Sequence, residues 1–207
     1  MLLSTDSGAV TFGWRLSLSE FPRLVTRHLA VVRGTREIES EADALVRADF
    51  PNADLPSFVK RVCLWGGYSG IAGRVLRDNT LSEIRLALQA ALAELDQPAP
   101  DIASALKHVN DLRGLGTPSF ASKHLRFLRP AVCPVLDSFV ASGLGYATTP
   151  RGYARLASDC QAVAASLKSL GLLNPMRDSN DWFVGDVDMA LFAGLQESAE
   201  VKGKGWQ

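Results

Sequence analysis

Asp137 is an isolated carboxylate that follows a tight glycine turn, Gly114-Leu115-Gly116, and stands twenty-one residues beyond Gly116. Glycine turns sharply and leaves the backbone bare, so its N–H groups can approach a ligand, and N–H groups beside a helix N-terminus bind phosphate. A single carboxylate close to such a site is a candidate for electrostatic or acid–base chemistry. The pattern therefore predicts a phosphate-binding turn that works together with an acid.

The turn stands between two segments whose apolar residues recur with helical spacing, and together they predict a helix-hairpin-helix at residues 101–129. Thr117 suits the cap of the second helix and Pro118 its first position. A plain helix–helix turn that ends in a C-cap glycine would fit the same residues. Phosphate contacts of this kind ignore base sequence, so we expect nucleic acid to be held by its backbone. The residues expected to contact that backbone are Arg113, Gly114, Leu115, Gly116, Thr117, Lys123 and Arg126.

Asp137 begins the segment DSFVASGLG after the proline-containing connector RPAVCPV, which places it at a helix N-terminus. Aspartate often fills the N-cap position of a helix, so capping alone would account for this residue. Its spacing from the glycine turn favours a further role. Asp137 is therefore the candidate catalytic residue.

Charge is distributed unevenly along a chain whose formal net charge is zero. Residues 107–155 carry seven basic residues against two acids, whereas residues 37–54 carry six acids against Arg47 alone. A neutral protein can present one basic face to phosphate, because charge interactions are screened beyond roughly 8–10 Å. The distribution favours such a face, and ordinary solvated helix surfaces are the alternative.

The composition of the 207 residues, 47% hydrophobic and 21% charged, is typical of a globular protein with a sizeable core. No apolar run reaches the roughly eighteen residues that a membrane helix needs, and no secretory signal is visible. The three cysteines and three histidines are widely spaced, so we expect neither a disulfide framework nor a metal site. These features predict a cytoplasmic protein that does not bind a membrane.

Helical periodicity dominates the chain and predicts an all-α fold with one compact helical domain. The clearest helix begins with Thr80 and Glu83 as a capping box and ends before Pro98. Strand-like alternation is confined to weak apolar pieces before residue 35. We expect residues 1–35 to pack on the domain, residues 36–197 to form it, and residues 198–207 to be a flexible tail. Further helices are expected at residues 39–49, 56–64, 68–77, 137–144, 150–171 and 186–196.

The stretch LRGLGTPSFASKHLRFLRPAVCPVLD, residues 112–137, resembles the helix-hairpin-helix and catalytic aspartate of the DNA glycosylase superfamily that includes 8-oxoguanine DNA glycosylase and endonuclease III. Gly114, Leu115 and Gly116 match the turn of that family, and Asp137 matches its acid. The resemblance implies a glycosylase-like helical fold. It also implies base excision from double-stranded DNA, with the target base flipped out of the duplex.

Two departures from the family pattern bear on the mechanism. Members with lyase activity carry lysine two positions after the second turn glycine, where this chain has Pro118, which offers no amine for a Schiff base. Lys123 lies more than a helical turn further on and is expected to face away, toward phosphate. Arg113 replaces the usual proline of the turn. The resemblance therefore implies a monofunctional glycosylase that uses water, leaves an abasic site and has no lyase activity.

The pocket for a flipped base is harder to place. Trp65 and Tyr68 flank two glycines in LWGGYSG, where aromatic faces can sandwich a base and the glycines leave room for it. Trp182 is a weaker candidate for the same role. Packing at a helix junction is the alternative for these aromatics, and Asp186 and Asp188 are expected to cap a helix.

Excision of a damaged or modified base from double-stranded DNA by a monomer is the leading functional prediction. An oxidised purine is the substrate that the resemblance implies, and a modified base of phage DNA, removed in antiviral defence, is the second version. The alternatives are a non-catalytic helix-hairpin-helix module that binds DNA or a partner, and an unrelated helical protein. No cofactor is expected, although a monovalent cation on the carbonyls of the turn stays open. His124 is expected either to touch phosphate or to pack.

Overall fold

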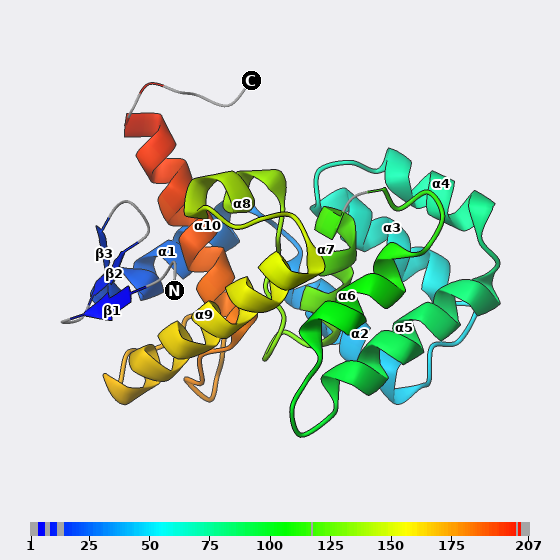
Figure 1. Cartoon of the computed structure of the whole chain (residues 1–207), viewed down its shortest axis with the longest axis horizontal. Helices are drawn as coiled ribbons and strands as arrows, with labels where there is room; N and C mark the ends of the chain where they lie inside the picture. The colour runs from blue at the N-terminus through cyan, green and yellow to red at the C-terminus, as the bar shows by residue number, and fades with distance from the viewer. Residues whose placement is uncertain (1–3, 7–8, 12–14, 117, 202, 204–207) are drawn as a thin grey trace.

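Helices dominate the computed structural model, which describes residues 4–6, 9–11, 15–116, 118–201 and 203 (Figure 1). The expectation of a predominantly helical protein is therefore confirmed. The helices are α1 (Phe21–Val31), α2 (Thr35–Arg47), α3 (Leu55–Trp65), α4 (Gly70–Asp78), α5 (Leu81–Leu95), α6 (Ile102–Asn110), α7 (Pro118–Leu128), α8 (Ser138–Leu144), α9 (Pro150–Ser169) and α10 (Val184–Val201).

A small antiparallel sheet precedes the helices and departs from the all-α expectation. Its strands pair in the order β1-β2-β3, with Val10 of the central strand opposite Thr5 and Leu16. Each strand has three residues, too few for the alternation pattern that identifies a strand from sequence. The segments are β1 (Ser4–Asp6), β2 (Ala9–Thr11) and β3 (Arg15–Ser17), followed by the 3-10 helix η1 (Leu18–Glu20).

The helices form two groups that lie side by side (Figure 1). In one group, called here the α10 half, α1, α8 and α9 pack against α10. In the other, the α7 half, α5 packs on α6, and α2, α3 and α6 pack on α7. Contacts between α6 and α9 join the two halves. The connector between α7 and α8, which carries the chain to Asp137, therefore crosses from one half to the other.

Helix α5 shows how the local sequence sets an element. The Thr80 hydroxyl accepts a hydrogen bond from the Glu83 N–H, and the Glu83 carboxylate accepts one from the Thr80 N–H, which confirms the predicted capping box. Ile84, Leu88 and Leu95 recur on one face and are buried. Burial of this apolar stripe against α6 holds the helix in place.

Helix α1 was missed at the sequence level. Pro22 stands in its first turn, where the missing N–H of proline does no harm. Phe21, Leu24 and Val25 are fully buried, and His28 joins the same face. This apolar stripe is short and follows directly on strand residues, so the sequence pattern showed only weak apolar pieces and did not predict a helix.

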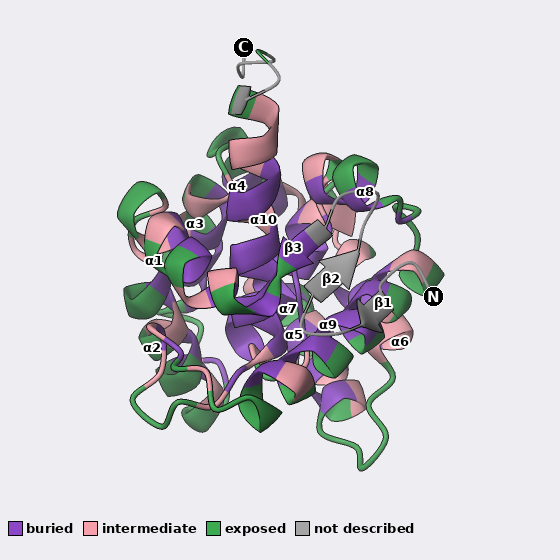
Figure 2. Ribbon diagram, turned by 90° about the vertical axis from the view of Figure 1, so that its left-hand side faces the viewer, coloured by how far each residue is buried: buried purple, intermediate pink, exposed green. Residues whose placement is uncertain are grey.

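Helix α10 is buried along most of its length (Figure 2). It continues to Val201 and so passes residue 198, where the flexible tail was expected to begin. Within the described residues no helix combines the length and apolar character needed to cross a membrane.

Candidate active site

The glycine turn between α6 and α7 is built against α4. Gly114 and Gly116 have φ angles of 80° and 88°, which favour glycine. A Cβ on Gly114 would lie 2.9 Å from Cβ of Arg74, whereas one on Gly116 would meet nothing within 4 Å. The side chain of Asn79 donates to the Arg113 carbonyl at 2.8 Å and accepts from its N–H at 3.1 Å. The turn is thus pinned at Arg113 and Gly114 and open at Gly116.

The other expected backbone-binding residues of the turn divide between surface and core. Leu115 was expected to contact the DNA backbone, but its side chain is buried and therefore cannot reach it. The Arg113 side chain is largely exposed, but its guanidinium donates to Glu83 Oε1 at 2.9 Å and to the Asp78 carbonyl at 2.6 Å. Thr117 lies outside the described residues.

Arg126 corrects one of the predictions. Its side chain is completely buried and its guanidinium pairs with the carboxylate of Glu39 on α2. It therefore cannot add charge to the surface of the turn. His124 is buried as well, where its Nδ1 contacts the Phe120 carbonyl and its ring packs on Phe58, so it packs and does not reach phosphate.

The prediction for Lys123 is also wrong. It was expected to face outward, yet it is 5% exposed, and its Nζ donates to Ser119 Oγ at 2.8 Å above the Phe120 ring. A Cβ on Gly66 would lie 2.7 Å from Cδ of Lys123, so the glycine at the end of α3 makes room for the lysine stem. Because α7 is covered by α3 on this side, the lysine lies inside the protein.

Lys123 and Asp137 line one partly enclosed cavity of about 90 Å³ where the α10 half meets the α7 half. Elements from both halves supply its walls, and aromatic and aliphatic side chains make up most of them. The lining residues are His28, Val32, Trp65, Gly66, Lys123, Val135, Asp137, Val140, Asp188 and Phe192.

Asp137 serves as the N-cap of α8 and borders the cavity at the same time. Its Oδ1 accepts a hydrogen bond from the Val140 N–H at 2.8 Å, and the residue is only half-buried. The preceding Leu136 donates its N–H to Ser122 Oγ at 3.0 Å, which ties the connector to α7 beside Lys123. Capping and a place in the cavity are therefore compatible for this residue.

Burial sets the protonation behaviour of the cavity. It lowers the pKa of Lys123, an effect that the charges of Asp137 and Asp188 partly oppose. It raises the pKa of Asp188 to about 8, with the charge of Asp137 acting in the same direction. It also lowers the pKa of His28 to about 3. The cavity therefore holds a desolvated amine, a carboxyl group that resists ionisation and a neutral imidazole.

The three aromatic residues proposed for the base pocket lie in different places in the structure. Trp65 lines the cavity, with its Nε1 donating to Thr35 Oγ1 at 3.0 Å and its ring edge-on to Phe127. Tyr68 is 55% exposed and is not among the cavity residues. Trp182 is buried in the core, where its Nε1 donates to the Leu172 carbonyl. Of the three, only Trp65 is placed to touch a ligand beside Asp137.

Sequence reasoning missed His28, Asp188 and Phe192 as cavity residues. Asp188 and Phe192 are spaced i, i+4 and so share one face of α10, which was the signal available. Asp186, expected to be a cap like Asp188, does accept the Phe183 N–H at 3.2 Å. Asp188 shows no such cap; its Oδ1 is buried without a hydrogen-bond partner among the described residues.

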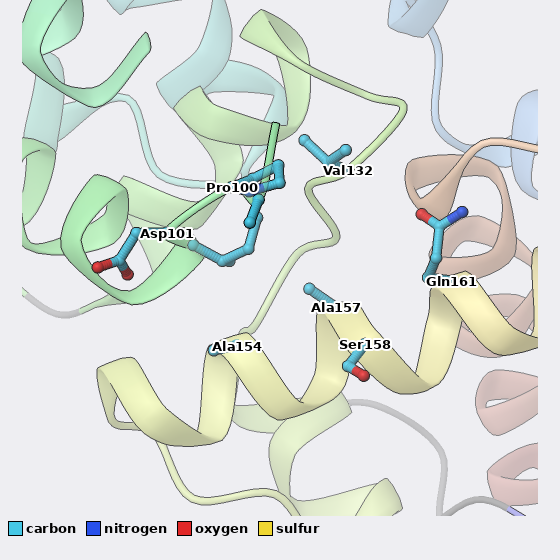
Figure 3. Close-up of a pocket in the computed structure, with 9 residues that line it drawn as sticks. Pro100, Asp101, Val132, Ala154, Ala157, Ser158 and Gln161 are labelled. Atoms are coloured by element: carbon cyan, nitrogen blue, oxygen red, sulfur yellow. The ribbon is translucent and has the colours of Figure 1, made fainter. Parts of the chain in front are cut away.

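A larger cleft of about 440 Å³ lies elsewhere, between the α5–α6 loop and α9 (Figure 3). Pro100, Val132, Ala154 and Ala157 give it a mainly apolar wall. Its one carboxylate, Asp101, caps α6 by accepting the Ser104 N–H at 2.9 Å. The described lining lacks a second ionisable group, so this cleft offers less chemistry than the cavity beside Asp137.

Several of the basic residues in the segment 107–155 are buried or paired with acidic residues in the folded protein. Beyond the buried Lys123, Arg113 pairs with Glu83, Arg126 with Glu39 and Arg129 with Asp96. In the part of the chain that the structure describes, no cluster of three or more His, Cys, Asp or Glu residues is arranged to hold a metal ion. No protein-family model, no curated protein and no solved structure matches this chain. Its function is therefore inferred from the residues of the site.

Proposed function

We propose that this protein is a DNA glycosylase that hydrolyses the N-glycosidic bond of a flipped damaged or modified base. One observation carries the proposal. Asp137, the acid singled out by its spacing from the glycine turn, borders a partly enclosed cavity with aromatic walls and a desolvated lysine. Such a combination of apolar walls and convergent ionisable groups is typical of an active site.

The reaction needs an anion beside the sugar. As the bond between C1′ and the base nitrogen breaks, its electron pair leaves with the base and positive charge develops on the sugar. Asp137 stabilises that charge from its position at the N-terminus of α8. Asp137 then takes a proton from the water that attacks C1′, and the departing base is protonated. The products are the free base and an abasic site.

The turn between α6 and α7 would hold the DNA backbone. Gly116 is exposed and open, and α7 begins two residues later, so the N-terminus of a helix follows directly on an open turn. We interpret α6, the turn and α7 as a helix-hairpin-helix motif. The neutralised arginines imply that this grip depends on backbone groups more than on a basic face.

The cavity has to widen to take a base. Its volume of about 90 Å³ is smaller than the roughly 150 Å³ of an apolar cavity that admits benzene. Trp65 and Phe192 come from different halves of the molecule, so a small separation of their side chains opens the space between them. A flipped base would then lie against aromatic faces, an arrangement that stabilises bases outside the stack.

Lyase activity is a second candidate because of the position of Lys123. Pro118 removes the usual amine, but Lys123 brings another to the same cavity as Asp137, and burial favours its neutral, nucleophilic form. Its Nζ would attack C1′ as the base leaves, and ring opening would give a Schiff base. Loss of a C2′ proton and of the 3′-phosphate would then break the strand.

The test is a panel of duplexes that carry oxidised, deaminated, alkylated and phage-type modified bases. Strand breaks are scored with and without alkali, and reduction with borohydride traps any Schiff base. Breaks that need alkali indicate hydrolysis, whereas direct breaks and a trapped adduct indicate the lyase route. Asp137→Asn is expected to abolish excision of whichever base is removed.

A matched control is Asp101→Asn, which alters another helix N-cap far from the cavity and should leave excision unchanged. A salt titration of binding to undamaged duplex distinguishes the non-catalytic alternative. Steep salt dependence without excision of any base would mean a DNA-binding module. Neither binding nor excision would mean an unrelated helical protein.

A further inference from the structure

Asp188 is an unexplained buried carboxyl group in the cavity. It is 4% exposed, borders the same space as Asp137 and Lys123, and its Oδ1 finds no hydrogen-bond partner in the described part of the chain. An unsatisfied buried polar atom costs about 1–3 kcal/mol. A ligand that enters the cavity can supply the missing partner.

The neighbouring cations do not satisfy Asp188. Arg126 pairs with Glu39, and Lys123 donates to Ser119 Oγ. Among the described residues no cationic group forms an ion pair with Asp188 within 4.0 Å. The carboxyl group is therefore not the anionic half of a structural salt bridge, and packing alone would be served better by an apolar side chain.

The groups around Asp188 favour its neutral form near pH 7. Burial and the charge of Asp137 raise the pKa to about 8, against weaker opposing effects of Arg126, the Val135 backbone and Lys123. Three further ionisable groups near Asp188 stay neutral, because burial raises the pKa of two of them and lowers that of the imidazole. They are Tyr153 and Cys160 on α9, and His28 on α1.

We propose that Asp188 is the specificity-determining residue of the cavity, and that it donates a hydrogen bond from its carboxyl group to an acceptor on the flipped base. The proposal rests on the glycosylase function proposed above. A protonated carboxyl group carries one O–H donor, so it favours a base that presents a carbonyl oxygen at the position that this donor reaches. An ionised carboxylate would instead select an edge with N–H donors, such as N1–H and N2–H of guanine.

The chemical class of substrate follows from this donor. We expect keto bases to be preferred over analogues that lack the carbonyl, because a site built to hydrogen-bond a group strongly rejects a ligand without it. Two probe pairs remove one carbonyl each. Hypoxanthine differs from unsubstituted purine by O6 and by the proton on N1, and uracil differs from 2-pyrimidinone by O4 and by the proton on N3.

The experiment measures, in duplexes, the ratio of excision rates for the keto base and its deoxo analogue at pH 6 to 9. Effects of pH on Asp137 or Lys123 act on both members of a pair and cancel in the ratio. For at least one pair we expect a ratio of about tenfold or more below pH 8, which falls toward one above pH 8 as Asp188 ionises. This wild-type measurement needs no variant to fold.

Two substitutions complete the test. Asp188→Asn keeps a hydrogen-bond donor that does not titrate, so its ratio should be independent of pH. Asp188→Leu removes the donor and should bring the ratio close to one at every pH, whatever its effect on the absolute rates. A ratio that Asp188→Leu leaves unchanged, or a wild-type ratio that does not vary with pH, overturns the role of Asp188 and leaves the glycosylase proposal standing. If the wild-type protein excises no base in any duplex, the glycosylase proposal itself fails and this inference falls with it.

Discussion

Asp137 combines two roles that can be separated by substitution. Asparagine keeps an oxygen that accepts the Val140 N–H, whereas alanine does not. We expect Asp137→Asn to lose excision with little change in the free energy of unfolding. Asp137→Ala should lose excision and also about 0.5–2 kcal/mol of stability, the usual cost of an N-cap. Urea denaturation of both variants checks this, and equal, large destabilisation by both would show that the charge itself holds the fold.

Lys123 gives a prediction about stability as well as chemistry. Its pKa is lowered in the folded protein because burial disfavours the charged amine. A lowered lysine pKa reduces stability as pH falls below the pKa of the unfolded chain, so the buried amine weakens the fold at pH 7. We therefore expect Lys123→Met to maintain or raise the free energy of unfolding at pH 7 while it removes any adduct trapped by borohydride.

The control for this prediction is Lys107→Met, since Lys107 is exposed on α6 and should affect neither measurement. A trapped adduct that survives Lys123→Met would place the nucleophile elsewhere. Marked destabilisation by Lys123→Met would show that the hydrogen bond from Nζ to Ser119 stabilises the fold by more than the burial of the amine destabilises it.

At the level of elements, the contact between the end of α3 and α7 positions the lysine. Gly66 has an ordinary φ of −72°, so the backbone conformation there would accept alanine. The obstacle is steric contact between the new Cβ and neighbouring side chains. A Cβ would lie 2.7 Å from Cδ of Lys123 and 3.0 Å from Cε1 of Phe120. We expect Gly66→Ala to cost about 1–3 kcal/mol of stability and to displace the lysine stem.

Gly73→Ala on α4 is the matched control, because a Cβ there meets nothing within 4 Å. It should be neutral or stabilising by up to about 1 kcal/mol. The double variant Gly66→Ala with Lys123→Ala should recover much of the loss from Gly66→Ala, since the opposed atoms are gone. Additive losses in this cycle would mean that Phe120, and not Lys123, resists the new methyl group.

The sequence predicted elements where periodicity and caps agree. The helix that begins at Thr80 and the helix that Asp137 caps follow from local rules, and both are present. Helix α1 was missed because its apolar stripe is short and its start carries a proline. Strands of three residues leave too little pattern to detect.

The site was predictable only in part, because it is assembled by tertiary contacts. Asp137 and Trp65 were found from spacing and local composition, and both line the cavity. The inward position of Lys123 depends on α3, which covers that face of α7, and no local pattern reveals it. Arg126 looked like a surface cation because its partner, Glu39, lies 87 residues away in the chain.

At the scale of the whole molecule, a buried ionic cluster joins the two halves. Glu39 of α2 accepts hydrogen bonds from Arg126 of α7 and, at 2.5 Å, from Nη1 of Arg177. Arg177 also binds Asp186 of α10 at 2.6 Å, so the chain of charges runs from the α7 half to the helix that carries Asp188. Arg126 and Asp186 have fully buried side chains, so solvent cannot replace a lost partner.

This cluster predicts that substitution of Glu39 strongly lowers the free energy of unfolding. Burial raises the pKa of Glu39, but the charges of Arg126 and Arg177 outweigh it and hold that pKa below the usual value. The lowered pKa contributes stability above the pKa of the unfolded chain, roughly pH 4.3, and the contribution is lost as pH falls below that value. Glu39→Gln leaves the Arg126 charge buried without its counterion, and we expect it to cost about 3–5 kcal/mol at pH 7.

The comparison for Glu39→Gln is Asp43→Asn, four residues along the same helix, where the partner Arg47 is exposed and the loss should stay under about 1 kcal/mol. Urea denaturation at pH 7 and pH 4 measures both. The difference in stability between Glu39→Gln and the wild-type protein should narrow at the lower pH, because Glu39 of the unfolded wild-type chain then takes up a proton. Since the cluster holds α10 against α7, Glu39→Gln should also impair excision more than Asp43→Asn. Equal stability of the two variants would mean that the halves are held together by apolar packing alone.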